Sequence, residues 1–304
     1  MAIRPSMRTS VGRDTGLMVR MGLTVGLLAI LYIAFVSVLL AVGAPIIFVA
    51  VIAGGLLFVQ YYFSDKIALA SMGARDVTPE QAPELHGMID RLCALADIPK
   101  PRVTIADTDL PNAFATGRSP KHAAVCVTTG LLARLDRDEL EGVLGHELTH
   151  VINRDVAVMT IAAFFATVAG FLVRMGLWGG FGFGGGDSDS RNTALMFVAI
   201  FVVSIVVYAL SYILINTLSR YREFAADRGG ALLTGAPANL ASALQKIQGT
   251  MARIPQRDLR ASSGASAFFI VPASIRGSLT GLFSTHPSTE KRIERLLEMQ
   301  RQIG

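Results

Sequence analysis

The long uncharged stretches of this chain constrain its fold more than any other feature. No Asp, Glu, Lys or Arg occurs between Arg20 and Asp65. Such a stretch is too long for one membrane span of about 20 residues and sufficient for two. Gly43-Ala44-Pro45 supplies a break within it. The sequence therefore predicts two spans, at roughly 21–42 and 46–63.

Two more apolar runs follow Asp155, from Val156 to Val173 and from Thr193 to Ser219. The composition agrees with four spans, because charged residues make up only 17% of the chain and the mean hydropathy is +0.49. In soluble proteins about a quarter of the residues are charged. A cleaved signal peptide does not fit the first run, because the run exceeds the usual length of about 7–15 residues and a second span follows at once.

Four spans bring the chain back to the side of the membrane on which it starts. The basic tail 1–20 and the segments 64–155 and 219–304 then share one compartment, and the spans form two hairpins, 21–63 and 156–218. Arg and Lys are concentrated in the three shared segments. The positive-inside rule therefore places these segments, and with them both termini, in the cytoplasm.

The segment 64–155 has the character of a soluble domain. Apolar residues at helical spacing predict a helix over Pro79–Ala96, and short strands are predicted at Arg102–Ala106 and Ala123–Val127. Leu110–Gly117 lies between the strands, and its proline tolerates only an edge position in a sheet. This segment is therefore either an exposed sheet edge, available to an extended peptide, or an ordinary surface loop.

The sequence His146-Glu147-Leu148-Thr149-His150 follows Asp136-Arg137-Asp138-Glu139, which has the pattern of a capping box. Histidines four residues apart project from one helix face, so both rings can bind a single zinc ion. Glu147 can then act on a water molecule as a general base. The alternative is a surface helix with two solvated histidines. Gly142 and Gly145 are poor helix formers, which indicates either close approach of another element or a substrate, or simple tolerance.

A catalytic zinc site needs a third protein ligand beside an open position. The histidine helix enters the membrane soon after His150, and the fourth span leaves it near Ser219 on the same side. Residues just beyond Ser219 then lie at the same depth, provided that the two spans pack together. Glu223 can complete a His-His-Glu site, and Asp227, on the same helix face, can accept a hydrogen bond from a ligand histidine. The alternative for this acidic pair is a helix end that balances neighbouring arginines.

The segments His146–Asp155 and Arg222–Asp227 together resemble the HtpX-type membrane zinc metalloproteases, which are relatives of the CAAX prenyl proteases. The resemblance implies one Zn²⁺ per chain, bound by the two histidines and Glu223, with Glu147 as the catalytic base. It also implies a role in protein quality control in the bacterial cytoplasmic (inner) membrane. Together with the spans, it predicts a mostly α, four-span helical membrane protein. Its cytoplasmic catalytic domain is expected to be zincin-like α+β and split by the second pair of spans.

The resemblance extends over nearly the whole chain and includes Pro111–Ala115 and His286-Pro287-Ser288. In the wider group an equivalent of Asn112 is thought to hold the substrate backbone, and an equivalent of His286 lies near the site. The resemblance therefore implies substrate-binding roles for four residues: Asn112, Ala113, Phe114 and His286. From the residues alone, His286 fits a capping residue of the last helix better than a catalytic group.

The expected chemistry is hydrolysis of peptide bonds in membrane-protein or unfolded polypeptide substrates at the lipid bilayer. Prenyl-peptide processing stays open as a rival substrate class, and an inactive zinc-binding scaffold or chaperone as a rival function. A transporter is disfavoured, because the spans contain no ionisable group apart from Arg174 near an end. Nucleic-acid binding is not expected, since no basic run is interleaved with aromatics. Cys93 and Cys126 are too few for a disulfide framework, and the sequence does not predict the oligomeric state.

Overall fold

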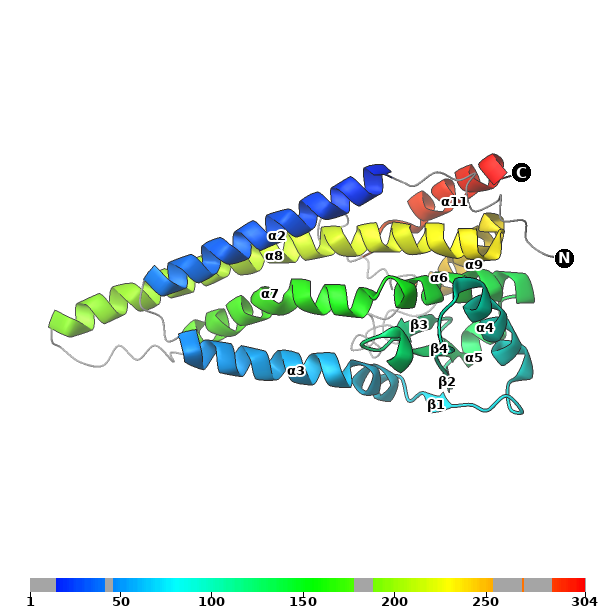
Figure 1. Cartoon of the computed structure of the whole chain (residues 1–304), viewed down its shortest axis with the longest axis horizontal. Coiled ribbons are helices and arrows are strands. Elements are labelled where there is room, and N and C mark those ends of the chain that lie inside the picture. Colours follow the sequence, from blue (N-terminus) through cyan, green and yellow to red (C-terminus); the bar gives the residue numbers. More distant parts are fainter. Residues whose placement is uncertain (1–14, 42–45, 178–187, 254–269, 271–285, 304) are drawn as a thin grey trace.

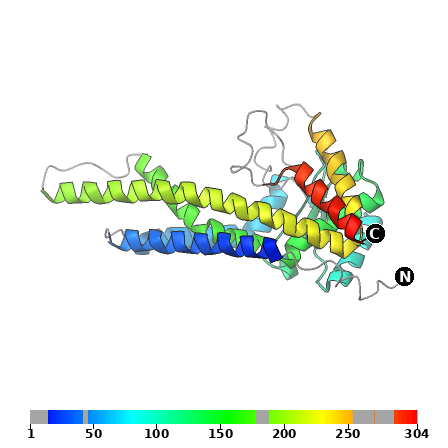
Figure 2. The ribbon, with the colours of Figure 1, turned by 90° about the horizontal axis from the view of Figure 1, so that it is seen from above.

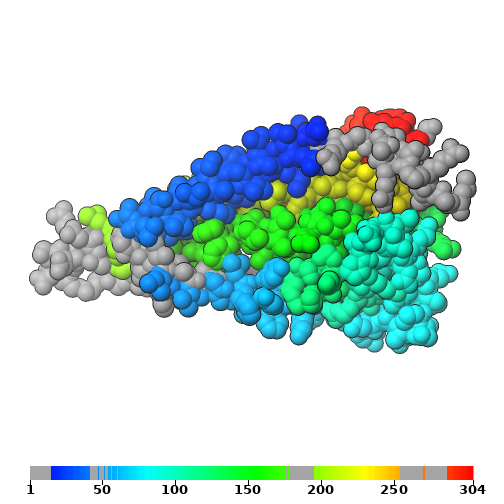
Figure 3. All heavy atoms as spheres, viewed as in Figure 1, coloured from blue at the N-terminus to red at the C-terminus, as the bar shows by residue number. Residues whose placement is uncertain are grey.

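The computed structural model of the protein describes residues 15–41, 46–177, 188–253, 270 and 286–303. The long helices are α2 Thr15–Ala41, α3 Ile46–Ser71, α7 Asp155–Leu177 and α8 Ser188–Thr234. They lie side by side and reach out from one end of the molecule, while the strands and shorter helices gather at the other end, here called the head (Figure 1). Seen from above, α8 passes through both parts (Figure 2). Side chains fill the space between α2, α7 and α8, so these helices form one packed unit (Figure 3).

Membrane spans can be assigned by length and composition to three helices among the described residues. These candidate spans lie within Thr15–Ala41, Asp155–Arg174 and Leu195–Thr234. They overlap the first, third and fourth predicted spans. The second predicted span lies within α3, and the total of four spans stays a prediction. The predicted break at 43–45 and residues 1–14 of the predicted tail lie outside the described residues.

The length of α8 explains how one helix can serve both the membrane and the head. Its 47 residues extend over about 70 Å at 1.5 Å per residue. The hydrocarbon core of a bilayer is only about 30 Å thick. The C-terminal part of α8 therefore continues beyond the bilayer into the head, where it packs against α6, Arg137–Ile152.

The head contains a small sheet with the strand order β1-β2-β4-β3. The strands are β1 Arg75–Asp76, β2 Arg102–Ala106, β3 Ala113–Thr116 and β4 Ala124–Thr128. β2 runs parallel to β4, and β3 runs antiparallel to β4 with Phe114 opposite Cys126. β3 is therefore an edge strand of the described sheet, so an ordinary surface loop is the wrong interpretation of Ala113–Thr116. The availability of this edge to an extended peptide stays a prediction. The strands predicted at 102–106 and 123–127 are found within one residue of their predicted ends.

The remaining elements of the head, within the residues that the structure describes, are helices. They are α4 Pro83–Ala96, η1 Pro120–His122, α5 Thr129–Leu132, α6, α9 Pro237–Met251 and α11 Thr289–Ile303. α4 starts four residues later than predicted, because Pro83 lacks an N–H and suits the first turn. The capping box of α6 is confirmed: Asp136 accepts a hydrogen bond from the Glu139 N–H, and Glu139 accepts one from the Asp136 N–H, both at 3.0 Å.

One hydrophobic core joins the chain segments on either side of the second pair of long helices. Leu92, Leu144 and Leu148 from the earlier segment pack in the same cluster as Leu244 and Leu296 from the later one. All five side chains are fully buried. Both segments therefore contribute to one core of the head.

The backbones of α6 and α8 are in direct contact where they cross. A methyl group at Gly230 would lie 2.6 Å from the backbone nitrogen of His146 and 2.9 Å from the carbonyl carbon of Gly145. A methyl group at Gly142 would lie 2.9 Å from the backbone nitrogen of Leu240 on α9. Close approach of neighbouring elements therefore explains the glycines in α6, and simple tolerance does not.

We expect Gly230→Ala to weaken both the fold and the metal site, because the added methyl group meets backbone atoms that cannot rotate away. Overpacking of this kind costs about 1–3 kcal/mol. Thermal unfolding of the purified protein in detergent should show a lower Tm than wild type. Gly249→Ala on α9 is the matched control, since a methyl group there meets nothing within 4 Å. Equal Tm values for Gly230→Ala and wild type would contradict this account of the crossing.

Both cysteines are buried, and we expect them to be inert in the folded protein. Burial raises the pKa of the Cys93 thiol to about 11 and also raises that of Cys126. A raised thiol pKa leaves little thiolate, the reactive form, at pH 8. Maleimide labelling at pH 8 should therefore be slow for native protein and fast after denaturation. Rapid labelling of either cysteine in native protein would show that this part of the core is open.

Candidate metal centre

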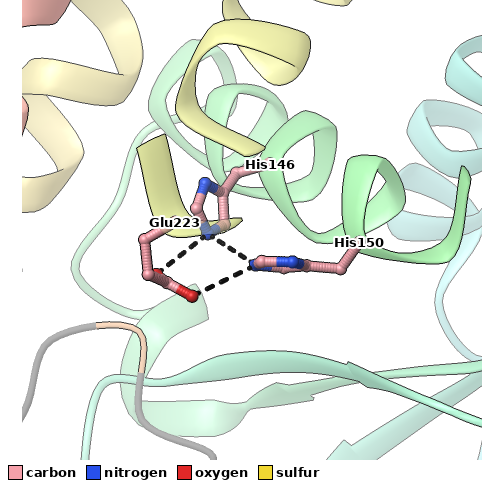
Figure 4. A group of neighbouring side chains, drawn as sticks. All are labelled: His146, His150 and Glu223. Atoms are coloured by element: carbon pink, nitrogen blue, oxygen red, sulfur yellow. Dashed lines mark hydrogen bonds and ion pairs between the residues drawn. The ribbon is translucent and has the colours of Figure 1, made fainter. Parts of the chain in front are cut away.

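The two histidines of α6 lie on one face of the helix, as their spacing predicts. Their Nε2 atoms are 3.2 Å apart, and their rings are nearly perpendicular, at 88° (Figure 4). His146 is fully buried, and the His150 side chain is 13% exposed. The alternative of a surface helix with two solvated histidines is therefore wrong.

α8 brings Glu223 to the same point from a distant part of the chain. Its two carboxylate oxygens lie 3.7 Å from His146 Nε2 and 3.5 Å from His150 Nε2 (Figure 4). Ligands about 2.0–2.1 Å from a tetrahedral zinc ion lie roughly 3.3 Å from one another. The three side chains therefore have the donor types and the spacing of a zinc site, and among the described residues they form a group able to hold a metal ion.

A second carboxylate orients each histidine from behind. Asp227 Oδ1 lies 2.9 Å from His146 Nδ1, and Asp155 Oδ2 lies 2.5 Å from His150 Nδ1. Such contacts fix the ring and leave Nε2 free to bind metal. Asp227 occupies the position predicted from the sequence. Asp155 was not predicted as part of the site, although it is the first residue of α7 and follows His150 by five positions.

Arg292 on α11 is a further part of the site that the sequence did not predict. It is 1% exposed and holds both oxygens of Asp227, through Nε at 2.9 Å and Nη2 at 2.7 Å. Its Nη1 donates to the Ile270 carbonyl at 2.8 Å and lies 3.5 Å from Glu223. Burial opposes the charge of this guanidinium, but Asp227 and Glu223 outweigh it and raise its pKa. Arg292 therefore stays charged and holds Asp227 against His146.

Glu147 lies beside the metal ligands and is held by the edge strand. One of its carboxylate oxygens accepts a hydrogen bond from the Ala115 N–H at 2.9 Å, and the residue is 4% exposed. Burial raises the pKa of Glu147 above its ordinary value, although His146 and His150 oppose the shift. A raised pKa suits a carboxylate that has to accept a proton and release it again.

The four residues with expected substrate-binding roles lie in different surroundings. Asn112 is fully buried, and its Oδ1 accepts a hydrogen bond from the Ile270 N–H at 2.9 Å. Ala113 is buried in the core under α6, whereas the Phe114 side chain is buried on the other face of the sheet against Leu69 of α3. The Phe114 side chain therefore points away from α6 and the metal ligands. His286 lies beside the site, with Nδ1 3.4 Å from Glu223.

Comparison with known proteins agrees with this geometry. A family model described as Peptidase family M48 matches residues 79–300. A protease HtpX homolog of Moorella thermoacetica is 55% identical, over 98% of this chain and 99% of that protein. A protease HtpX homolog of Streptomyces coelicolor is 49% identical, over 98% of this chain and 97% of that protein. The crystal structure of S. mikatae Ste24p shares the fold, with a TM-score of 0.57 at 16% identity, over 93% of this chain and 67% of that chain.

A His-His-Glu group and a buried glutamate, held at the end of long apolar helices, define a metalloprotease of the membrane. The chain belongs to peptidase family M48, in which its relatives are the HtpX-type proteases. It is therefore a hydrolase of peptide bonds. M48 proteases depend on zinc, and His146, His150 and Glu223 are the residues that fit this ion.

We expect Asp227→Asn to weaken zinc binding by about 10–100-fold, because it removes the charge that orients His146 and leaves Arg292 with a neutral partner. Competition with a chromogenic chelator should measure this loss in the purified protein. Asp138→Asn, an exposed change in the first turn of α6, is the control and should bind zinc like wild type. Unchanged affinity in Asp227→Asn would mean that His146 needs no such support.

Proposed function

We propose that the protein is a zinc-dependent endopeptidase that cleaves misfolded or damaged membrane proteins at the cytoplasmic face of the bacterial inner membrane. One observation carries this proposal: the metal-binding group, Glu147 and the sheet edge β3 meet in the head, where α6 passes into the membrane helix α7. A site at this place can reach polypeptide that emerges from the bilayer.

Glu147 performs the proton transfers of the proposed reaction. Its buried carboxylate takes a proton from the attacking water and gives it to the amine that leaves when the C–N bond breaks. The Ala115 N–H fixes the direction of this carboxylate. When bound, zinc supplies a Lewis acid that polarises the scissile carbonyl and makes water more acidic.

The edge strand β3 offers a place for the substrate backbone. In an antiparallel pair, alternate residues bond to the partner strand. The Asn112 carbonyl accepts from the Thr128 N–H at 3.0 Å, so the backbone groups of Ala113 and Ala115 point away from β4. Glu147 already binds the Ala115 N–H there. An extended peptide that adds to this edge is thereby placed next to the general base and the metal ligands.

The positive-inside rule supports a cytoplasmic head and cytoplasmic termini, in agreement with the four spans expected from the sequence. The printed names of the relatives support proteolysis but name no substrate. Prenyl-peptide processing therefore remains the second candidate substrate class. An inactive scaffold is less well supported, because such a protein has no need for a base at Glu147.

Cleavage by the Glu147→Gln variant tests the proposed function. We expect zinc-loaded wild type in lipid nanodiscs to cleave an unfolded membrane protein and to spare the folded form of the same protein. Glu147→Gln should bind zinc normally and lose at least about 10²-fold in rate, the contribution typical of general base catalysis. A chelator should abolish wild-type activity, and zinc should restore it.

Glu84→Gln is the matched control, since it makes the same change at an exposed position in the first turn of α4. It should cleave like wild type. Equal cleavage by wild type and Glu147→Gln would reject the assigned base. Cleavage of a prenylated peptide but of no unfolded membrane protein would favour the second substrate class.

A further inference from the structure

A small hollow lies beside the metal centre, at the end of the edge strand. One wall consists of Thr116, Gly117 and Ser119, where β3 passes into the following loop. The other wall consists of Arg154 and Asp155, in the turn between α6 and α7. Its volume of about 10 Å³ has room for roughly one water-sized group. The hollow can therefore receive a small polar group, and polar side chains lie at its lining to contact it.

The charge around this hollow is unbalanced. The Asp155 carboxylate is already engaged, by His150 at 2.5 Å and by Arg222 at 3.1 Å. Arg154 is exposed and makes no ion pair with any residue that the structure describes. Among the charged side chains that line the hollow, Arg154 is therefore the one with no ion-pair partner among the described residues.

Arg154 also has an unusual backbone conformation. Its φ is +54°, in the left-handed region, where a side chain other than Gly, Asn or Asp is uncommon. The turn between two helices could be made by glycine without this cost. Residues held in such conformations often serve a binding site, and here the arginine lines a hollow next to a ligand histidine.

Peptide direction decides which part of a substrate meets this hollow. Antiparallel pairing is the more stable arrangement for a strand added to a sheet edge. A peptide antiparallel to β3 runs so that the residues before its scissile bond lie beside Thr116 and Gly117. These residues of the substrate then pass over the hollow, while those after the scissile bond run toward Asn112.

We infer that Arg154 and Ser119 form a subsite that selects a short acidic side chain at the second or third position before the scissile bond. This inference rests on the proposed proteolytic function and gives it a substrate preference. Arg154 supplies the positive charge, and the Ser119 hydroxyl, 3.0 Å from His122 Nδ1, supplies a second polar contact. The carboxylate of the substrate replaces water in the hollow and neutralises Arg154.

The preference can be measured with peptides that differ at one position. A fluorogenic peptide cleaved by the wild-type protein is changed to Asp, Asn or Lys at each of four positions before and two positions after the scissile bond. The ratio of kcat/KM for Asp to that for Lys is compared for wild type and Arg154→Glu, both zinc-loaded and full length. We expect wild type to favour Asp by about three- to fivefold at the second or third position, as for one exposed ion pair. Arg154→Glu should favour Lys there.

Two further variants keep the test decisive. Arg154→Gly removes the positive charge, and glycine suits the positive φ, so this variant should fold. Its ratio of kcat/KM for Asp to that for Lys should be near one at the second or third position before the scissile bond. Arg137→Glu makes the same charge change at the other end of α6, about 25 Å away along the helix, and should keep the wild-type ratio.

The outcomes separate this inference from the proposed function. Cleavage by wild type with equal ratios in all variants would overturn the subsite and leave the proteolytic function intact. A change confined to positions after the scissile bond would overturn the placement of the substrate. Failure of zinc-loaded wild type to cleave any peptide or unfolded protein would overturn the proposed function, and the subsite with it.

Discussion

The close crossing of α6 and α8 is the contact on which the rest of the structure depends. At this crossing Gly230 lies directly against the backbone of His146. Any side chain at Gly230 would push the two helices apart, and Glu223 would then move away from the histidines. Ligand atoms only 3.2–3.7 Å apart tolerate little displacement. The geometry of the metal site is thus set by a backbone contact two turns away from Glu223 along α8.

The balance of charges at the metal centre also suits a divalent cation. Four carboxylates gather there, from Glu147, Asp155, Glu223 and Asp227, and two guanidinium groups face them, from Arg222 and Arg292. Buried charges are costly unless they are paired. With neutral histidines, the group has two negative charges in excess, which a dication neutralises. The same excess explains why Arg292 is fully buried without loss of its charge.

Local patterns revealed the parts of this site that lie within one element. The spacing of His146 and His150, the capping box at Asp136 and the edge position implied by Pro111 all depend on short-range chemistry. Glu223 and Asp227 followed from topology, because two packed spans bring their ends to one depth. Arg292 could not be predicted in this way, since an arginine in an amphipathic helix is usually solvated. Only the tertiary fold turns it toward Asp227.

The edge strand β3 is supported from two sides. One face of β3 packs on α3, where Phe114 lies against Leu69, and the Tyr61 hydroxyl of α3 donates to the Arg118 carbonyl at 3.2 Å. The other side of β3 holds Glu147. The strand is therefore fixed between a long apolar helix and the general base.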